Sequence, residues 1–284
     1  MKNSFTLALL LGCLATPLFA QSSPVSPKGE PTNAAEAAAQ KAASDQKRDA
    51  RYFAIVESLS PPQQAWEKVL QENLGNFYLD GHKNDKIANR SNAWDFVQDD
   101  PKLPRVLLIG DSVSRGYTLP TRAALSGKAN VHRAPENCGP TKNGLKKIDV
   151  WLGENQKWDV IHFNFGIHDR ATPVGEYAER LEQLVLRMKA TGAILVWAST
   201  TPIPDDPAKG QKAAAILEHN EAAAALMQKH GIAIDDLFTA ITPKLDKMQI
   251  PNDVHFNASG YDFLGQKVAE SLEAAIRSLP ERKN

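Results

Sequence analysis

The sequence has little cysteine and no excess of charge of either sign. Its 284 residues include two cysteines, and 33 basic side chains are balanced by 33 acidic ones. A chain without net charge has no electrostatic attraction for nucleic acid or for an anionic membrane surface, so we expect neither as a partner. What the chain does have is 42 % hydrophobic residues, enough for one substantial core.

The first twenty residues have the layout of a secretory signal peptide. Lys2 precedes the apolar run Phe5–Leu11, and the largely apolar stretch ends at Ala20, before a polar segment. We prefer cleavage after Ala20, which predicts a periplasmic or extracellular protein. The other interpretation is a lipobox that ends at Cys13, with an acyl anchor that holds the protein to a membrane. After cleavage at Ala20 only Cys138 remains, so no internal disulfide can form.

Composition divides the rest of the chain into three parts. Residues 21–48 carry almost no large apolar side chains, so we predict a disordered linker with at most a transient helix in its alanine run. Residues 49–103 are predicted to be a helical and irregular lead-in. In this lead-in Ser60 starts a helix that runs to Leu74, and residues 76–103 are irregular. Residues 104–284 form the main domain.

Strand-like and helix-like segments alternate from residue 105 onward. This alternation favours a parallel sheet with helices on both faces, in which functional loops follow the carboxyl ends of the strands. The predicted strands are 105–109, 130–133, 159–165, 193–199 and 232–237. The predicted helices are 118–125, 145–152, 174–190, 209–230 and 259–279.

The first candidate catalytic residue is Ser112. An apolar run stops at Gly110-Asp111-Ser112, so a buried strand delivers a serine to the start of a helix. Gly110 permits a sharp turn, and the free N–H groups of a helix start point towards any anion that forms there. An ordinary strand-to-helix turn with a serine cap would show the same residues, so the function depends on a partner elsewhere in the chain.

A candidate base lies near the other end of the chain. His255 stands in a polar loop before the last predicted helix, and histidine has the pKa that suits removal of a proton from serine. At this point the chain resembles the SGNH hydrolases, also called GDSL esterases and lipases, over roughly residues 104–278. Their first block is Gly-Asp-Ser and their last is an acid–x–x–His loop. The resemblance implies a three-layer, flavodoxin-like, doubly wound α/β domain with Ser112 as nucleophile, His255 as base and no cofactor.

Two middle blocks of the family supply the donors that hold the developing oxyanion. Residues 137–145 resemble the second block, in which Gly139 would donate its backbone N–H beside that of Ser112. The third block is Gly-x-Asn-Asp in the family but Gly-Ile-His-Asp at 166–169 here, so His168 replaces the asparagine donor. A neutral imidazole has one N–H and needs a partner at its other nitrogen to fix the tautomer. Asn164 is the alternative donor.

The acid that orients His255 is also displaced in this chain. The family places it three residues before the histidine, where Asn252 stands, whereas Asp253 lies two residues before. Three alternatives remain at this point. Asp253 reaches Nδ1, Asn252 or a backbone carbonyl orients a Ser–His dyad, or an acid comes from elsewhere in the fold. We expect a dyad-like site assisted by Asn252 or Asp253.

Four further residues are candidates for contact with the substrate. Arg115 and Arg170 follow the serine block and the third block and could clamp a carboxylate or sulfate. Asp169 ends the third block, and Trp197 lies at a predicted strand end, where a wall of the site would be. Solvent-exposed arginines and a core tryptophan are the alternatives.

The expected function is that of an exported serine esterase acting on small acyl esters, above all acetyl groups on carbohydrates. Export and a neutral surface suit extracellular glycans. A lipid or aryl esterase is the alternative within enzymes, and a degenerate glycan-binding domain is the alternative outside them. The histidines lack metal-ligand spacing, so we expect no metal; metal-assisted hydrolysis through His168, Asp169 and His132 is the third alternative. The oligomeric state stays open.

Overall fold

The computed structural model describes residues 33–206, 208 and 211–280. The predicted signal peptide and Cys13 lie outside these residues. The chain divides into two compact units, one that ends at Gln46 and one that begins at Lys47. Among the described helices, none combines the length and the apolar character needed to cross a membrane.

Helix α1 (Asn33–Glu57) corrects part of the predicted linker. Residues 33–48 are helical, so the prediction of disorder over residues 21–48 is wrong for this part of it. Alanine has the highest helix propensity, and the pair Lys41–Asp45 joins consecutive turns at a spacing of four residues. Almost all of these side chains are exposed, so this part of the helix has no buried apolar face. A helix is predicted from the sequence mainly by such a face, and this one was therefore missed.

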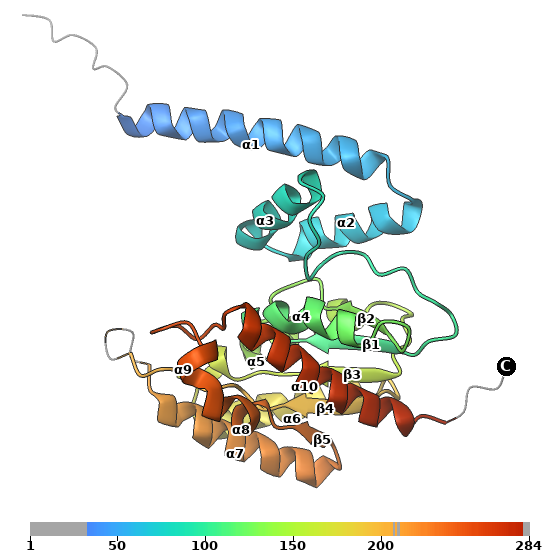
Figure 1. Cartoon of the computed structure of the whole chain (residues 1–284), viewed down its shortest axis with the longest axis vertical. Helices are drawn as coiled ribbons and strands as arrows, with labels where there is room; N and C mark the ends of the chain where they lie inside the picture. Colours follow the sequence, from blue (N-terminus) through green and yellow to red (C-terminus); the bar gives the residue numbers. More distant parts are fainter. Residues whose placement is uncertain (1–32, 207, 209–210, 281–284) are drawn as a thin grey trace, which may run out of the picture. The chain divides into compact units, whose positions relative to one another are not determined.

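The main domain is built on a five-stranded parallel sheet with the strand order β2-β1-β3-β4-β5 (Figure 1). This is the flavodoxin-like order, in which the chain winds outward in both directions from the first strand and ligands bind at the carboxyl ends of the strands. The predicted α/β fold class is therefore confirmed. The strands are β1 (Arg105–Ile109), β2 (Asn130–Arg133), β3 (Val160–Phe163), β4 (Ile194–Ala198) and β5 (Ala233–Asp235).

Helices cover both faces of the sheet and complete two hydrophobic cores. Alternate residues of a strand point to opposite faces. In β1, Val106 and Leu108 pack in the core that includes α4 and α10, whereas Leu107 and Ile109 pack in the core that includes α5, α6 and α7. The covering helices are α4 (Ser112–Ala124), α5 (Thr141–Leu152), α6 (Val174–Lys189), α7 (Ala213–His230) and α10 (Ala258–Arg277).

Four short elements of the main domain were not expected, and α4 begins six residues earlier than predicted, at Ser112. The short elements follow β3 and β5, where polar residues interrupt any periodic pattern. They are η1 (Ile167–Asp169), α8 (Leu237–Ile241), η3 (Thr242–Lys244) and α9 (Leu245–Met248).

The lead-in contains two helices, α2 (Pro61–Asn73) and α3 (Asn76–Ile87). Helix α2 matches the prediction, but the expectation of irregular structure from residue 76 is wrong. The buried side chains of α3 are Leu79, His82 and Lys83, so polar residues interrupt its inward face and weaken the apolar signal in the sequence. Trp66 of α2 donates a hydrogen bond from Nε1 to the carbonyl of Trp94 at 2.7 Å, and Arg122 of α4 donates to the carbonyl of Ala93 at 3.1 Å. The first bond holds α2 to the last part of the lead-in, and the second joins the lead-in to the main domain.

Candidate active site

Ser112 is the first residue of α4, directly after the carboxyl end of β1. Asp111 caps the helix, because its Oδ1 accepts a hydrogen bond from the amide of Val113 at 2.9 Å. The turn before it is tight, since a Cβ at Gly110 would lie 2.7 Å from Oγ of Ser114. Asp111 therefore has a structural role, and the turn holds Ser112 at the carboxyl edge of the sheet.

Arg133, at the end of β2, supports this turn. Its buried guanidinium donates to Oγ of Ser114 at 2.6 Å and to the carbonyls of Gly110 and Asp111 at 3.1 Å and 2.9 Å. The sequence reasoning missed this residue. The sequence did contain a signal for this role, namely a charged side chain at the end of a strand whose neighbours are buried. A buried arginine must find hydrogen-bond acceptors.

Ser112, His255 and Asp253 form one hydrogen-bonded set, the Ser–His–Asp array. Oγ of Ser112 lies 2.7 Å from Nε2 of His255, and Nδ1 of His255 lies 2.6 Å from Oδ1 of Asp253. The same carboxylate oxygen accepts the His255 amide at 3.1 Å. Partial burial would raise the pKa of Asp253, but these hydrogen bonds and the charge of His255 outweigh it and hold the pKa below its usual value.

Of the three alternatives for the acid, the structure shows the first, in which the Asp253 carboxylate is hydrogen-bonded to Nδ1 of His255. The expectation was that Asn252 or Asp253 assists the imidazole, and the Asn252 side chain makes no hydrogen bond within the described residues. Its backbone instead takes the left-handed conformation with φ of 58°, which asparagine tolerates better than most residues. The turn at Asn252 accounts for the spacing of two between acid and histidine. A serine bonded to an imidazole that is oriented by a carboxylate is the arrangement that activates a hydroxyl nucleophile.

Two backbone N–H groups near Ser112 have no acceptor. The amides of Ser112 and Gly139 donate to no group in the described part of the chain. Gly139 has φ of 67°, a left-handed conformation that favours glycine. Both amides are therefore free to donate to an oxyanion.

Asp169 supports the Gly139 segment and does not reach the substrate. The residue is fully buried, and its carboxylate accepts from the amide of Thr141 at 2.8 Å and from the Thr141 hydroxyl at 2.6 Å. The prediction that Asp169 contacts substrate is therefore wrong. Its charge lies at the N-terminus of α5, where backbone N–H groups favour a carboxylate.

The two candidates for the side-chain oxyanion donor lie in different environments. Asn164 is buried, and its amide already donates to the Ala198 carbonyl at 2.8 Å and to Oγ1 of Thr200 at 3.0 Å. His168 is exposed in η1, and neither ring nitrogen has a partner among the described residues. Of the two, only His168 has an uncommitted N–H, and no protein group selects its tautomer.

The three remaining substrate-contact candidates also differ. Trp197 is 1 % exposed and lies in the core with α6 and α7, so the prediction that it forms a wall of the site is wrong. The sequence placed Trp197 correctly along its strand, but it did not determine the face of the sheet to which the side chain points. Arg170 donates to the carbonyl of Ile167, in its own turn, at 2.7 Å. The Arg115 guanidinium lies 5.6 Å from the centre of the Tyr78 ring.

Neither Cys138 nor a metal cluster offers a second reactive centre in the described part of the chain. Burial raises the pKa of the Cys138 thiol to about 12, so the thiol stays neutral. No three His, Cys, Asp or Glu side chains gather at one point among the residues described. His132 is hydrogen-bonded to Asp99 at 2.6 Å, whereas Asp169 is hydrogen-bonded to Thr141 at 2.6 Å. The two residues thus have separate partners.

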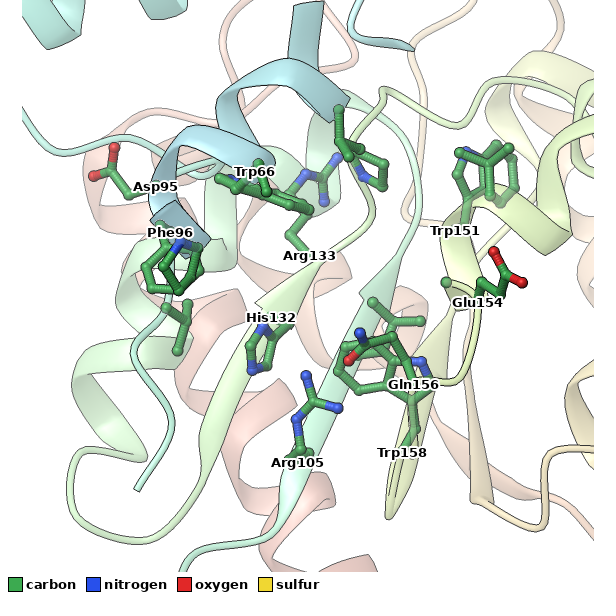
Figure 2. A pocket seen from close by; sticks show the side chains of 18 of the residues that line it. Trp66, Asp95, Phe96, Arg105, His132, Arg133, Trp151, Glu154, Gln156 and Trp158 are labelled. Atoms are coloured by element: carbon green, nitrogen blue, oxygen red, sulfur yellow. The ribbon is translucent and has the colours of Figure 1, made fainter. Parts of the chain in front are cut away.

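An aromatic pocket of about 440 Å³ lies between α2, the β2 edge of the sheet and the end of α5. Figure 2 shows Trp66 and Phe96 on one side of it and Trp151 and Trp158 on the other. The Arg105 guanidinium lies 4.3 Å from the centre of the Trp158 ring. No member of the Ser–His–Asp array lines this pocket.

A Ser–His–Asp array at the carboxyl edge of a flavodoxin-like sheet defines the class of α/β serine hydrolases. Residues 108–263, more than half of the chain, match the model of the GDSL-like lipase/acylhydrolase family, and the chain belongs to that family. The domain is thus a hydrolase domain of the SGNH type.

Solved structures show the same fold at low sequence identity. A lipase/acylhydrolase from Enterococcus faecalis is 20 % identical with a TM-score of 0.54, over 64 % of this chain and 100 % of that one. A catalytic mutant of an acetylxylan esterase from Geobacillus stearothermophilus is 14 % identical with a TM-score of 0.50, over 61 % of this chain and 94 % of that one. A comparison with curated proteins gave no match.

Proposed function

We propose that the protein is an exported serine esterase that removes small acyl groups, in the first place acetyl groups, from carbohydrates. One observation carries the proposal. Oγ of Ser112 is 2.7 Å from Nε2 of His255, whose Nδ1 is 2.6 Å from the Asp253 carboxylate. This geometry gives the serine a base and gives the base a fixed orientation and a compensating charge.

The reaction follows from these contacts. His255 takes the Ser112 proton as Oγ attacks the ester carbonyl, and Asp253 stabilises the imidazolium that forms. The amides of Ser112 and Gly139, with the ring N–H of His168, receive the oxyanion. The imidazolium then protonates the departing alcohol oxygen and leaves an acyl-serine. A water molecule gives its proton to His255 and attacks the acyl-serine, which releases the carboxylic acid and restores Ser112.

The exposure of the site supports a carbohydrate ester as substrate. The His255 and Asp253 side chains are 34 % and 44 % exposed, so an ester on a large, hydrated chain can approach them. The acetylxylan esterase with a TM-score of 0.50 is a protein of this fold that is named for such a substrate. Export is supported by Lys2 and the apolar run that follows it.

The proposal is tested by turnover of a graded set of esters by the folded protein. We expect p-nitrophenyl acetate and an acetylated xylo-oligosaccharide to be hydrolysed, with kcat/KM at least tenfold lower for p-nitrophenyl octanoate. Ser112→Ala should reduce all rates to background. A preference for octanoate would contradict the small acyl group. Glycan binding without turnover of any ester would contradict the esterase and support the degenerate domain.

Export is tested by the N-terminus of the protein recovered from secreting cells. A mature chain that begins at Gln21, measured by intact-mass spectrometry, is the expected result. A chain that begins at a lipid-modified Cys13 would support the anchored alternative, and an uncleaved chain would contradict export.

A further inference from the structure

A second cavity, of about 370 Å³, lies between the lead-in and α4. One of its walls is the face of α4 that carries Arg115, Gly116 and Leu119, together with Tyr261 at the start of α10. Residues three or four apart on a helix share a face, so Ser112 lies one turn before the wall formed by Arg115 and Gly116. The cavity therefore starts one helical turn from the serine.

Tyr261 connects this cavity with the array. Its ring packs so closely on Gly116 that a side chain there would collide with it, and it makes an edge contact with Phe256, next to His255. Burial raises the pKa of the Tyr261 hydroxyl, and the charges of Arg115 and Asp253 both act on that hydroxyl. The cavity and the array thus share one electrostatic environment.

The lead-in supplies the opposite wall, and two of its polar side chains, Asn92 and Asp85, already make hydrogen bonds. The amide oxygen of Asn92 accepts the Trp94 amide at 2.9 Å, and the amide nitrogen of Asn92 is 3.1 Å from Nδ1 of His82. The Asp85 carboxylate accepts from Arg90 at 2.8 Å. All of these residues except Arg90 line the cavity.

Two donors of the lining have no acceptor. Nε of Arg115 is buried and unbonded, and within the described residues its guanidinium has neither a hydrogen bond nor an ion pair. Nε1 of Trp94 is likewise buried and unbonded, in a side chain that is 4 % exposed. A buried donor without an acceptor costs free energy, and an uncompensated cation costs more. The lining therefore favours a ligand that brings acceptors and negative charge.

We propose that this cavity binds the carboxylate of an acidic sugar unit next to the acylated one, with Arg115 as the residue that recognises it. The inference rests on the proposed function, since it names the kind of glycan on which the esterase acts. A guanidinium presents a planar fork that matches a carboxylate. The Tyr78 ring, which contacts Trp94 at 5.3 Å and the 84 % exposed Phe77 at 4.9 Å, lines the same cavity 5.6 Å from the Arg115 guanidinium.

The catalytic test compares two acetylated oligosaccharides of equal length and acetyl content, a galacturonide and a neutral xyloside. Acetate release should show a higher kcat/KM for the galacturonide, mostly through KM. Arg115→Gln should lower that preference about tenfold or more, as expected for loss of hydrogen bonds to a charged group. Trp94→Phe should lower it less, because it removes one neutral donor and keeps the ring.

A matched control removes one positive charge elsewhere. Arg180 pairs with Glu176 on α6, which covers the other face of the sheet. The Arg180→Gln variant should therefore retain the preference. An acetylated, sulfated xyloside tests the other oxyanion, and a preference for it above the galacturonide would overturn the carboxylate assignment. A wild-type enzyme without preference for the galacturonide would overturn the inference, as would an unchanged preference in folded Arg115→Gln.

A binding test separates this inference from the proposed function. Unacetylated trigalacturonate should bind to Ser112→Ala protein in calorimetry, and Arg115→Gln added to that protein should weaken the binding about tenfold or more. Binding without hydrolysis of any ester would contradict the esterase and leave the carboxylate subsite standing. Ester hydrolysis with no binding of trigalacturonate would contradict the subsite alone. Arg115→Lys, which keeps the charge but not the fork, should bind with intermediate strength.

Discussion

Two regions of the molecule bring a hydroxyl, a histidine and a carboxylate together, with opposite exposure. In the lead-in, the Glu67 carboxylate accepts from the Tyr52 hydroxyl at 2.7 Å and lies 2.8 Å from Nε2 of His82. The side chains of His82 and Glu67 are 0 % and 1 % exposed. In the Ser–His–Asp array the contacts are as short, but the His255 and Asp253 side chains are 34 % and 44 % exposed.

The difference shows that burial, more than contact distance, determines what such a set does. Burial would raise the pKa of Glu67, but hydrogen bonds and charge from His82, with further bonds from Lys86 and Tyr52, lower it to about 2. Breaking that set leaves an uncompensated charge in the interior, so it bears on stability. The His255–Asp253 pair of the Ser–His–Asp array is partly exposed, whereas Ser112 is 9 % exposed, so loss of that pair bears on reaction rate and little on folding.

The largest expected effect is that of His255→Ala. Loss of the base should lower kcat about 10⁵-fold, because a serine without a base is a weak nucleophile. The free energy of unfolding, measured by urea titration, should change by less than about 1 kcal/mol, because the ion pair with Asp253 is exposed. A rate within tenfold of the wild type would contradict the role of His255.

Asp253→Asn should have the next largest effect. An amide can orient the imidazole but cannot stabilise its positive charge, so we expect kcat to fall about 10⁴-fold, as for the corresponding change in serine proteases. Asn252→Ala is the matched control and should leave kcat within about tenfold. A loss of less than tenfold for Asp253→Asn, measured in single turnovers, would favour a Ser–His dyad.

In the buried set of Tyr52, Glu67 and His82 we expect the opposite pattern, a loss of stability without a loss of rate. Glu67→Gln should lower the free energy of unfolding by about 3 kcal/mol, because His82 and Lys86 lose their buried counter-charge. The kcat of the folded fraction on p-nitrophenyl acetate should stay that of the wild type. Glu72→Gln, an exposed change on the same helix, is the control and should cost less than about 0.5 kcal/mol. Equal unfolding midpoints for the two variants would contradict the comparison.

A smaller effect is expected at His168. His168→Ala should lower kcat about 10²-fold, the low end of the range for loss of an oxyanion donor, because no protein group fixes its tautomer. KM should be nearly unchanged, and His168→Asn should recover part of the rate. If asparagine gives no more activity than alanine, His168 donates nothing to the oxyanion.

A pH dependence of stability is also expected from Glu67. Its pKa in the folded protein is about 2 and its ordinary value is 4.5, so the unfolded chain binds more protons between these values. The stabilisation is complete above about pH 4.5 and is lost as the pH falls to about 2. Urea midpoints measured across this window should fall less steeply for Glu67→Gln than for the wild type. Parallel curves would show that Glu67 does not titrate as described.

The centre of the sheet was predictable because β1, β3 and β4 are largely apolar runs that end at polar or glycine residues, as at Gly110. The two ends of the Ser–His–Asp array were predictable because Ser112 and His255 stand in short motifs with a chemical reason for each residue. Helix α3 was not, since the partners of its buried His82 lie on α2 and in the loop that follows α3.

Side-chain direction accounts for the other errors. A loop turn decides whether position 252 or 253 faces the imidazole, and the sequence contains no measure of that turn. Trp197 lies near the end of β4 and Asp169 in η1 after β3, but Asp169 is bonded to Thr141 and Trp197 points into the core. Arg133 was missed because it reaches its three acceptors in residues 110–114 only after β1 and β2 pair.

The central claim is that Ser112 carries the activated hydroxyl of this molecule. Its most direct test is covalent labelling by a fluorophosphonate, followed by peptide mass spectrometry of the wild type and of His255→Ala. We expect one labelled residue, Ser112, and loss of labelling in folded His255→Ala, with Tyr52 unlabelled in both. Labelling of another residue, or labelling of Ser112 that persists without His255, would contradict it.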